Sequence, residues 1–218
     1  RGVVMVRLTE HKKAIVVCII LIFIITTMVD VMLPKRTTEI KKNTVYMSGV
    51  YLEYPDKDDP RYYLEFKDDN TYVLMYDDSR RREENYNEDG DGSHPRIWIY
   101  FGKYEVKNNN YLIKPTESGM VGFKDTANVK KFIINSYGCR NYKNDKSIKG
   151  RIIFKTKKGH YILGVPNDSR SSYRRDTPYS MLYNKSDIKK LPSSVEEFRK
   201  QFKMDKKAEQ DLLKRQSS

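Results

Sequence analysis

The pattern of hydrophobic and polar positions divides the chain into two unlike parts. From Ala14 to Val29 the side chains are almost all apolar (AIVVCIILIFIITTMV), and Lys12 and Lys13 stand directly before this run. Beyond residue 44, short stretches alternate large apolar or aromatic residues with polar ones, as in strands that bury one face. The pattern therefore predicts a membrane-spanning N-terminus followed by a mainly β domain.

The apolar run has the length of a membrane anchor. Extended through Val31–Leu33 it covers residues 14–33, and at about 1.5 Å per residue such a helix crosses a hydrocarbon core of roughly 30 Å. Pro34 then ends the helix. No small-residue cleavage site follows the run, which disfavours a removable signal peptide. The run has no polar face either, which disfavours a buried helix of a soluble fold.

The anchor sets the expected domain organisation. We expect a basic cytoplasmic N-terminus (residues 1–13), the transmembrane anchor (14–33), a juxtamembrane spacer (34–44), a β-barrel-like domain (45–184) and a C-terminal amphipathic helix with its tail (185–218). Basic residues are equally frequent on both sides of the anchor. The orientation therefore rests on Lys12 and Lys13, which adjoin the run, and on the ease with which long C-terminal domains translocate. These observations predict a single-pass membrane protein whose C-terminal domain is extracytoplasmic.

Strand signals recur throughout the β domain. Three segments, FKDDNTYVLMY, VKNNNYLIK and KTKKGHYILGV, share a strand, a polar turn and a tyrosine followed by apolar residues, which is typical of hairpins. The equivalent tyrosines are Tyr72, Tyr111 and Tyr161. The predicted strands are Tyr46–Tyr54, Arg61–Lys67, Thr71–Asp77, Ile97–Val106, Tyr111–Lys114, Lys131–Asn135, Arg151–Thr156, His160–Val165 and Tyr179–Asn184. Successive hairpins build a meander.

Three local features refine this picture. Gly102 interrupts a strand pattern and predicts a bulge or bend. Asp77–Ser93 is a long charged segment without apolar anchors, which we expect to be a mobile loop. Near the C-terminus, Ser194 and Glu197 form the pattern of a helix capping box ahead of Phe198. The predicted fold is an antiparallel meander barrel or strongly bent sheet, with one C-terminal helix that braces it.

The residue pattern of this β domain resembles that of a known class of protein domains. GVYLEY, YYLEFKDDNTYVLMY and GKYEVKNNNYLIK, within the span from about Ser48 to Asn184, resemble the small membrane-tethered lipocalin-like domains of Gram-positive bacteria. The resemblance implies an extracytoplasmic barrel whose interior holds a small apolar ligand, without specifying that ligand.

Charge and cysteine content bear on partners and compartment. Residues 51–100 carry a net charge of −7, whereas 101–150 and 151–218 carry +6 and +9. Basic surface serves nucleic acid, anionic lipid or anionic wall polymer, and a membrane anchor favours the last two, so no nucleic acid partner is expected. Cys18 lies in the anchor and Cys139 in the domain, so they do not pair. A domain of this size without a disulfide favours a bacterial cell envelope.

Metal and cofactor chemistry finds little support. The histidines, His11, His94 and His160, lack the spacing of a zinc site. The segment Asn85–Arg96 resembles a calcium loop in its alternating oxygen ligands, but its twelfth position is an arginine where a bidentate glutamate is needed. We therefore predict no metal site, no cofactor and no cofactor-binding residues.

One enzymatic alternative stays open. Sortases are anchored β-barrel transpeptidases with a cysteine nucleophile, a histidine and an arginine, and Cys139, His94 and Arg151 supply these residue types. However, Ser136–Gly138 replaces the family's T-L-x-T pattern, which favours an incidental thiol near a turn. We assign no catalytic residue. The favoured hypothesis is a membrane-anchored extracytoplasmic binding module of the bacterial cell envelope, with a protein-partner or immunity-type envelope protein as the alternative.

Overall fold

The computed structural model describes residues 33–50, 52–86, 93–145, 148 and 150–210. The predicted anchor lies outside these residues except for Leu33, and so does the predicted cytoplasmic N-terminus. In the part of the chain that is described, no helix combines the length and apolar character needed to cross a bilayer. From Lys35 onward the chain forms one compact unit.

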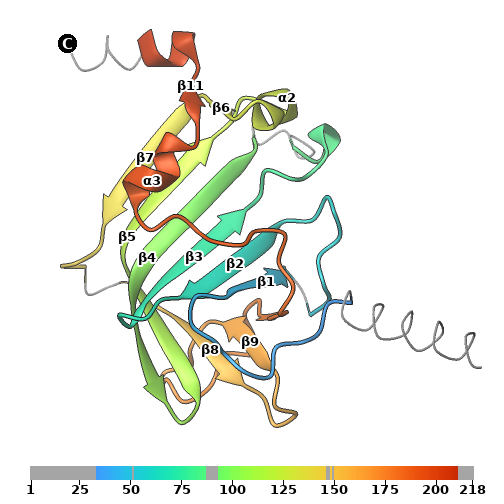
Figure 1. Cartoon of the computed structure of the whole chain (residues 1–218), viewed down its shortest axis with the longest axis vertical. Helices are drawn as coiled ribbons and strands as arrows, with labels where there is room; N and C mark the ends of the chain where they lie inside the picture. The colour runs from blue at the N-terminus through green and yellow to red at the C-terminus, as the bar shows by residue number, and fades with distance from the viewer. Residues whose placement is uncertain (1–32, 51, 87–92, 146–147, 149, 211–218) are drawn as a thin grey trace, which may run out of the picture. The chain divides into compact units, whose positions relative to one another are not determined.

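This unit is mainly β, and its centre is a nine-stranded antiparallel sheet (Figure 1). The sheet order is β1-β2-β3-β4-β5-β8-β9-β10, and β7 pairs with β5 off this path. The strands are β1 (Val45–Gly49), β2 (Arg61–Phe66), β3 (Thr71–Asp77), β4 (Arg96–Lys107), β5 (Asn110–Gly122), β7 (Ser136–Asn141), β8 (Arg151–Lys155), β9 (Tyr161–Gly164) and β10 (Ser180–Met181). The smaller elements are η1 (Glu83–Asn85), α2 (Thr126–Lys130), β6 (Ile133–Ile134), α3 (Val195–Lys200) and β11 (Lys203–Met204).

The two ends of the sheet meet, so the sheet curls into a nearly closed barrel. Tyr183, just after β10, donates its backbone N–H to Met47 of β1 at 2.8 Å and accepts one from it at 3.1 Å. This two-bond bridge is the hydrogen-bonded pair of an antiparallel ladder. The structure thus confirms the prediction of a mainly β, antiparallel meander barrel.

The three predicted hairpins are present, and their turns share a backbone feature. Asn70 in the β2–β3 turn, Asn108 and Asn109 in the β4–β5 turn, and Gly159 in the β8–β9 turn all have positive φ angles. Asparagine and glycine tolerate this left-handed conformation better than other residues. The tyrosine after each turn contributes to one cluster in the barrel interior, formed by Tyr46, Leu64, Phe66, Tyr72, Leu74, Tyr104, Ile113, Ile153, Tyr161, Leu163 and Leu182, with Tyr111 packed against it.

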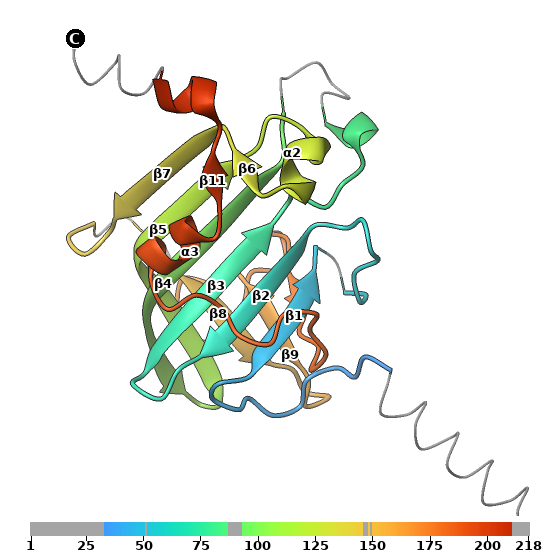
Figure 2. The same cartoon turned by 45° about the horizontal axis from the view of Figure 1, so that its top comes forward.

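The outer face of the sheet is also covered, which corrects the expectation that the strands bury only one face. The C-terminal segment crosses this face (Figure 2), and its Leu191, Phe198 and Phe202 are buried against residues such as Tyr63. Glu65, expected on a polar face, is only 2 % exposed because it accepts the backbone N–H of Leu191 at 2.9 Å. The alternation of apolar and polar residues identified the two faces of the sheet. It did not indicate that the outer face is buried under the C-terminal segment.

The short helix α3 anchors this C-terminal cover. As predicted, the Ser194 side chain caps the helix by accepting the Glu197 N–H at 3.1 Å, although the Glu197 carboxylate contacts Ser193 instead of completing the box. The helix ends after six residues and is followed by β11, which pairs in parallel with β6. The predicted brace therefore consists of an extended segment, the six-residue helix α3, the two-residue strand β11 and a further helical stretch at residues 206–210.

Three local predictions have different outcomes. The bulge at Gly102 is confirmed, because the register of β4 on β5 shifts between Phe101 and Gly102. The charged loop after β3 does have an apolar anchor, since Tyr86 is buried and its hydroxyl donates to the Asp78 carbonyl. Cys139 does not lie near a turn. It is exposed on β7, a strand that the sequence pattern did not reveal.

Candidate ligand-binding groove

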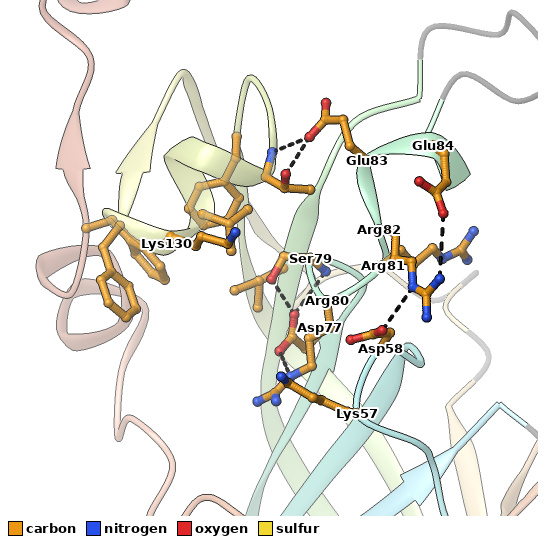
Figure 3. A pocket seen from close by; sticks show the side chains of 16 residues that line it. Lys57, Asp58, Asp77, Ser79, Arg80, Arg81, Arg82, Glu83, Glu84 and Lys130 are labelled. Carbon is orange, nitrogen blue, oxygen red and sulfur yellow. Dashed lines mark hydrogen bonds and ion pairs between the residues drawn. The ribbon is translucent and has the colours of Figure 1, made fainter.

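A charged pocket of about 700 Å³ lies where η1 and α2 approach the end of β3 (Figure 3). Its charges largely satisfy one another. Asp77 accepts hydrogen bonds from the Ser79 hydroxyl at 2.6 Å and from Arg80 at 2.7 Å. Glu83 accepts the backbone N–H of Thr126 at 2.8 Å. Because these groups are paired within the protein, the pocket is better explained as a structural junction between loops than as a site for a charged ligand.

A second hollow, of about 470 Å³, has a different character, and we call it the aromatic groove. It is lined by Tyr62, Tyr72, Leu74, Tyr76, Trp98, Tyr100, Ile113, Pro115, Tyr142, Ile148, Gly150 and Arg151. Several of these side chains lie on the barrel's inner face, since Tyr62 and Tyr76 alternate along β2 and β3 with the same period as Leu64 and Leu74 of the interior cluster. The groove is thus a continuation of the barrel interior.

One wall of the groove is a row of aromatic rings built by the strand register. Tyr62, Tyr76 and Trp98 lie directly opposite one another on β2, β3 and β4. Their ring centroids are 4.6 Å apart between Tyr62 and Tyr76, and 5.6 Å apart between Tyr76 and Trp98. All three side chains are only half-buried. Cross-strand aromatic pairs stabilise a sheet, but half-exposed ones also offer a binding surface of apolar area and hydroxyl groups.

Arg151, the first residue of β8, faces this wall. Its guanidinium carbon lies 5.6 Å from the centroid of the Tyr62 ring, a cation–π arrangement. The arginine is half-buried, and among the described residues no carboxylate forms an ion pair with it. No acidic side chain lines the groove either. Within the described part of the chain, the groove therefore contains a positive charge without a counter-ion.

The tyrosines around Arg151 are uncharged hydrogen-bonding groups. Burial raises the pKa of the Tyr76 phenol to about 12, and burial also raises the pKa of Tyr72 and of Tyr100. The charge of Arg151 opposes the rise in pKa at Tyr72 and Tyr100, which places the guanidinium electrostatically close to both phenols. The hydroxyls therefore remain protonated and can donate hydrogen bonds at neutral pH.

The groove exists because β5 changes partners. Its first residues pair with β8 as far as Ile113, and its later ones pair with β7 from Glu117 onward. At this change the backbone packs so closely that a Cβ atom on Gly102 would lie 2.0 Å from the Lys114 carbonyl oxygen, and one on Gly150 equally close to that of Ile113. The two glycines allow the bend, and the departing strands β7 and β8 leave the groove between them.

A basic cleft of about 270 Å³ adjoins the aromatic groove and shares five lining residues with it: Ile113, Pro115, Tyr142, Gly150 and Arg151. It adds four cationic side chains, Lys103, Lys114, Lys143 and Arg170, against the single carboxylate of Glu105. Arg151 therefore stands at the boundary between an aromatic surface and a strongly positive one.

The residue types of the sortase alternative are not assembled into one site. Cys139 lies opposite Gly119 on β5, whereas Arg151 lies opposite Ile113, six residues earlier on the same strand. At about 3.3 Å per residue, this separation is up to about 20 Å along β5. The His94 ring contacts the Arg96 guanidinium at 3.1 Å. Arg151 is the member of this set that lines the groove, in a role that sequence reasoning did not assign.

Metal binding finds no support in the described part of the chain, where no cluster of three or more His, Cys, Asp or Glu side chains could hold an ion.

Comparison with known proteins does not assign the chain: no protein-family model matches it, and no curated protein sequence matches it significantly. The function is therefore inferred from the groove. The sequence signal for that groove was present in the alternating tyrosines of β2 and β3.

Proposed function

We propose that this protein is a membrane-anchored, extracytoplasmic binding module of the bacterial cell envelope, and that its ligand occupies the aromatic groove. The apolar run at residues 14–33 provides the anchor in this proposal. The nearly closed barrel is consistent with the lipocalin-like class that the sequence resembles. The single observation that carries the binding role is the groove itself, whose aromatic lining includes an arginine that forms no ion pair with the residues that the structure describes.

The dimensions and composition of the groove fit a small ligand. Ligand pockets in proteins typically have volumes of about 300–1,000 Å³ and combine apolar or aromatic walls with a few polar groups. The aromatic groove falls in this range at about 470 Å³. The neighbouring part of the barrel interior is filled by large side chains such as Phe66 and Tyr104.

Trp98 provides a direct test, because it is the only tryptophan of the chain and lines the groove. A ligand in the groove changes the emission of Trp98. We would titrate the full-length protein, held in solution by a non-ionic amphipol, with lipid and metabolite extracts of bacterial envelopes. Tyr100→Ala, which removes a lining ring, is expected to weaken the response at least about tenfold, whereas Tyr173→Ala, a half-buried tyrosine packed on Phe154 outside the groove, is expected to leave it unchanged. Equal responses from the two variants would contradict the proposed site.

The anchoring part of the proposal has a separate test. The protein is expected in the membrane fraction, and a tag on its C-terminus is expected to be digested by protease added to intact cells whose outer surface is accessible. A soluble full-length protein, or a protected tag, would contradict the proposed topology.

A protein partner remains a second candidate because β7 offers an edge for strand addition. Among the described residues β7 pairs only with β5, and Cys139 and Arg140 on it are exposed. An unpaired strand edge presents N–H and C=O groups to a partner strand. The Tyr142 N–H bonds to Thr116 of β5, and hydrogen-bonded pairs alternate along an antiparallel ladder, so the Cys139 N–H points to the open edge. A partner that binds through this edge would be lost on Cys139→Pro, because proline removes that backbone donor, while the Trp98 response to small ligands would persist.

A further inference from the structure

We infer that the aromatic groove binds an amphipathic organic anion, with its carboxylate or phosphate on the guanidinium of Arg151 and its apolar body along the aromatic wall. This inference rests on the proposed function of the groove and names the chemical class of its ligand. Three features of the described residues support it.

The first feature is the uncompensated charge. Removing a cation from water is costly unless it is paired, and the half-buried Arg80 is paired in this way: it contacts Asp77 at 2.7 Å and Asp187 at 3.0 Å. Arg151 has an aromatic ring but no carboxylate in the same position. A guanidinium with free N–H groups inside a groove is suited to an incoming carboxylate or phosphate, which accepts its hydrogen bonds in bidentate geometry.

The second feature is a set of hydroxyl donors beside that charge. The hydroxyls of Tyr72 and Tyr100 form no hydrogen bond with another described residue, although both tyrosines line the same groove as Arg151. By contrast, the Tyr142 hydroxyl, elsewhere in the groove, is 3.0 Å from that of Ser118. Phenolic hydroxyls are donors as well as acceptors. Together with Arg151 they form a donor set that an anion satisfies and that a cation or a purely apolar molecule does not.

The third feature is the division of the surface into two chemically different halves. The part of the aromatic groove outside the shared residues has an apolar lining, with Leu74, Trp98 and Ile148. The adjoining cleft is instead rich in lysine and arginine. Exposed cations near a site raise the local concentration of anions and accelerate their association. The arrangement selects a ligand with an apolar body and an anionic end over a neutral lipid and over a wholly polar anion.

The test compares ligands that differ only at one end, with Trp98 emission as the readout in the amphipol-held full-length protein. The probes are octanoate, octyl phosphate, 1-octanol and octylammonium, with glycerol phosphate as an anion that lacks an apolar body. One of the two amphipathic anions, or both, is expected to bind at least about tenfold more tightly than octanol, because a hydrogen bond to a charged group contributes about 1.5–3 kcal/mol. The tighter of the two identifies the preferred headgroup. Octylammonium and glycerol phosphate are expected to bind more weakly than octanoate and octyl phosphate.

Variants assign the preference to Arg151. Arg151→Gln is expected to remove the advantage of the anion over octanol while leaving octanol binding within about threefold, and Arg151→Lys is expected to restore part of the advantage. Arg199→Gln is the matched control, since Arg199 also lies over a tyrosine ring, that of Tyr137 at 5.4 Å, but does not line the groove. It is expected to leave the preference intact.

The possible failures are distinguishable. If octanol and the anions bind equally well to the wild-type protein, or if glycerol phosphate binds as tightly as octyl phosphate, the inferred ligand class is wrong although the groove still binds. If Arg151→Gln retains the full preference for the anion, the role of Arg151 is wrong. If no probe and no envelope extract changes the emission of Trp98, the proposed function of the groove fails and this inference with it.

Discussion

Replacing Gly102 with alanine tests whether the close contact between β4 and β5 shapes the barrel. In the structure a Cβ atom at this position would lie 2.0 Å from the Lys114 carbonyl oxygen and 2.8 Å from the Pro115 Cα. Both contacts are with backbone, so no side-chain rotation relieves them, and the two strands must separate by about 1.4 Å to reach an ordinary contact of 3.4 Å. Such overpacking typically costs about 1–3 kcal/mol, and a backbone clash belongs at the upper end of that range.

A smaller effect opposes this cost. Alanine restricts the unfolded chain more than glycine does, which contributes about 0.4–1 kcal/mol of stability where the native conformation allows it. The net loss in the free energy of unfolding is therefore about 2 kcal/mol. At about 2–4 °C per kcal/mol for a chain of this size, the Tm falls by about 4–8 °C. Because Pro115 lines the aromatic groove, ligand binding is expected to weaken as well.

Gly138→Ala is the matched control for this substitution. Gly138 also lies in a strand of the same sheet, but the nearest atom to its added Cβ would be the Met120 Cε at 3.9 Å, an ordinary contact. This variant is expected to be neutral or up to about 1 kcal/mol more stable. Urea unfolding monitored by far-ultraviolet circular dichroism and by Trp98 fluorescence measures both. If the free energies of unfolding of the two variants differ by less than about 0.5 kcal/mol, the close approach at Gly102 does not constrain the fold.

Three further perturbations test the cover and the tyrosines. Phe198→Ala leaves a cavity at a fully buried side chain of α3 and is expected to lower the free energy of unfolding by about 3–5 kcal/mol. Phe132 is 59 % exposed, so Phe132→Ala is expected to change the free energy of unfolding by less than about 0.5 kcal/mol. Urea unfolding of the two variants measures this difference. Glu65→Gln weakens the contact that holds Leu191 to the sheet and is expected to accelerate tryptic cleavage in the C-terminal cover, and an unchanged cleavage rate would contradict that contact's role. In absorbance titration at 295 nm, Tyr76 is expected to ionise near pH 12. Since its pKa is higher in the folded state than the ordinary value of 10, its contribution to stability is complete below pH 10 and is lost as the pH rises from about 10 to 12; tyrosine absorbance that rises in a single step at pH 10 in the folded protein would refute this.

Local chemistry alone determined much of the β architecture. The hairpin turns around Asn70, Asn108 and Gly159 follow from residues that tolerate positive φ, and the strands beside them follow from strict alternation of apolar and polar positions. The bulge at Gly102 and the cap at Ser194 were likewise predictable, because each depends on the conformational freedom or hydrogen-bonding capacity of one residue and its immediate neighbours.

Elements that depend on distant partners were not predictable in this way. The second half of β5 and the whole of β7 contain Pro115, several small residues and few apolar ones, so no period marks them, and pairing along the bent sheet makes them strands. The cover on the outer face depended on Leu191 reaching Glu65, 126 residues earlier in the chain, and on α3 packing against β4 and β5.

The aromatic groove shows most directly the difference between features set by local sequence and features set by distant parts of the chain. The sequence by itself determined that tyrosines alternate along β2 and β3 and that an arginine opens β8. Only the tertiary structure decided that Arg151 stands over Tyr62 and that no carboxylate of the described residues forms an ion pair with it. The physical reason is that a side chain's neighbours within a strand are set by its period of two, whereas its neighbours across the barrel are set by the curvature and closure of the whole sheet.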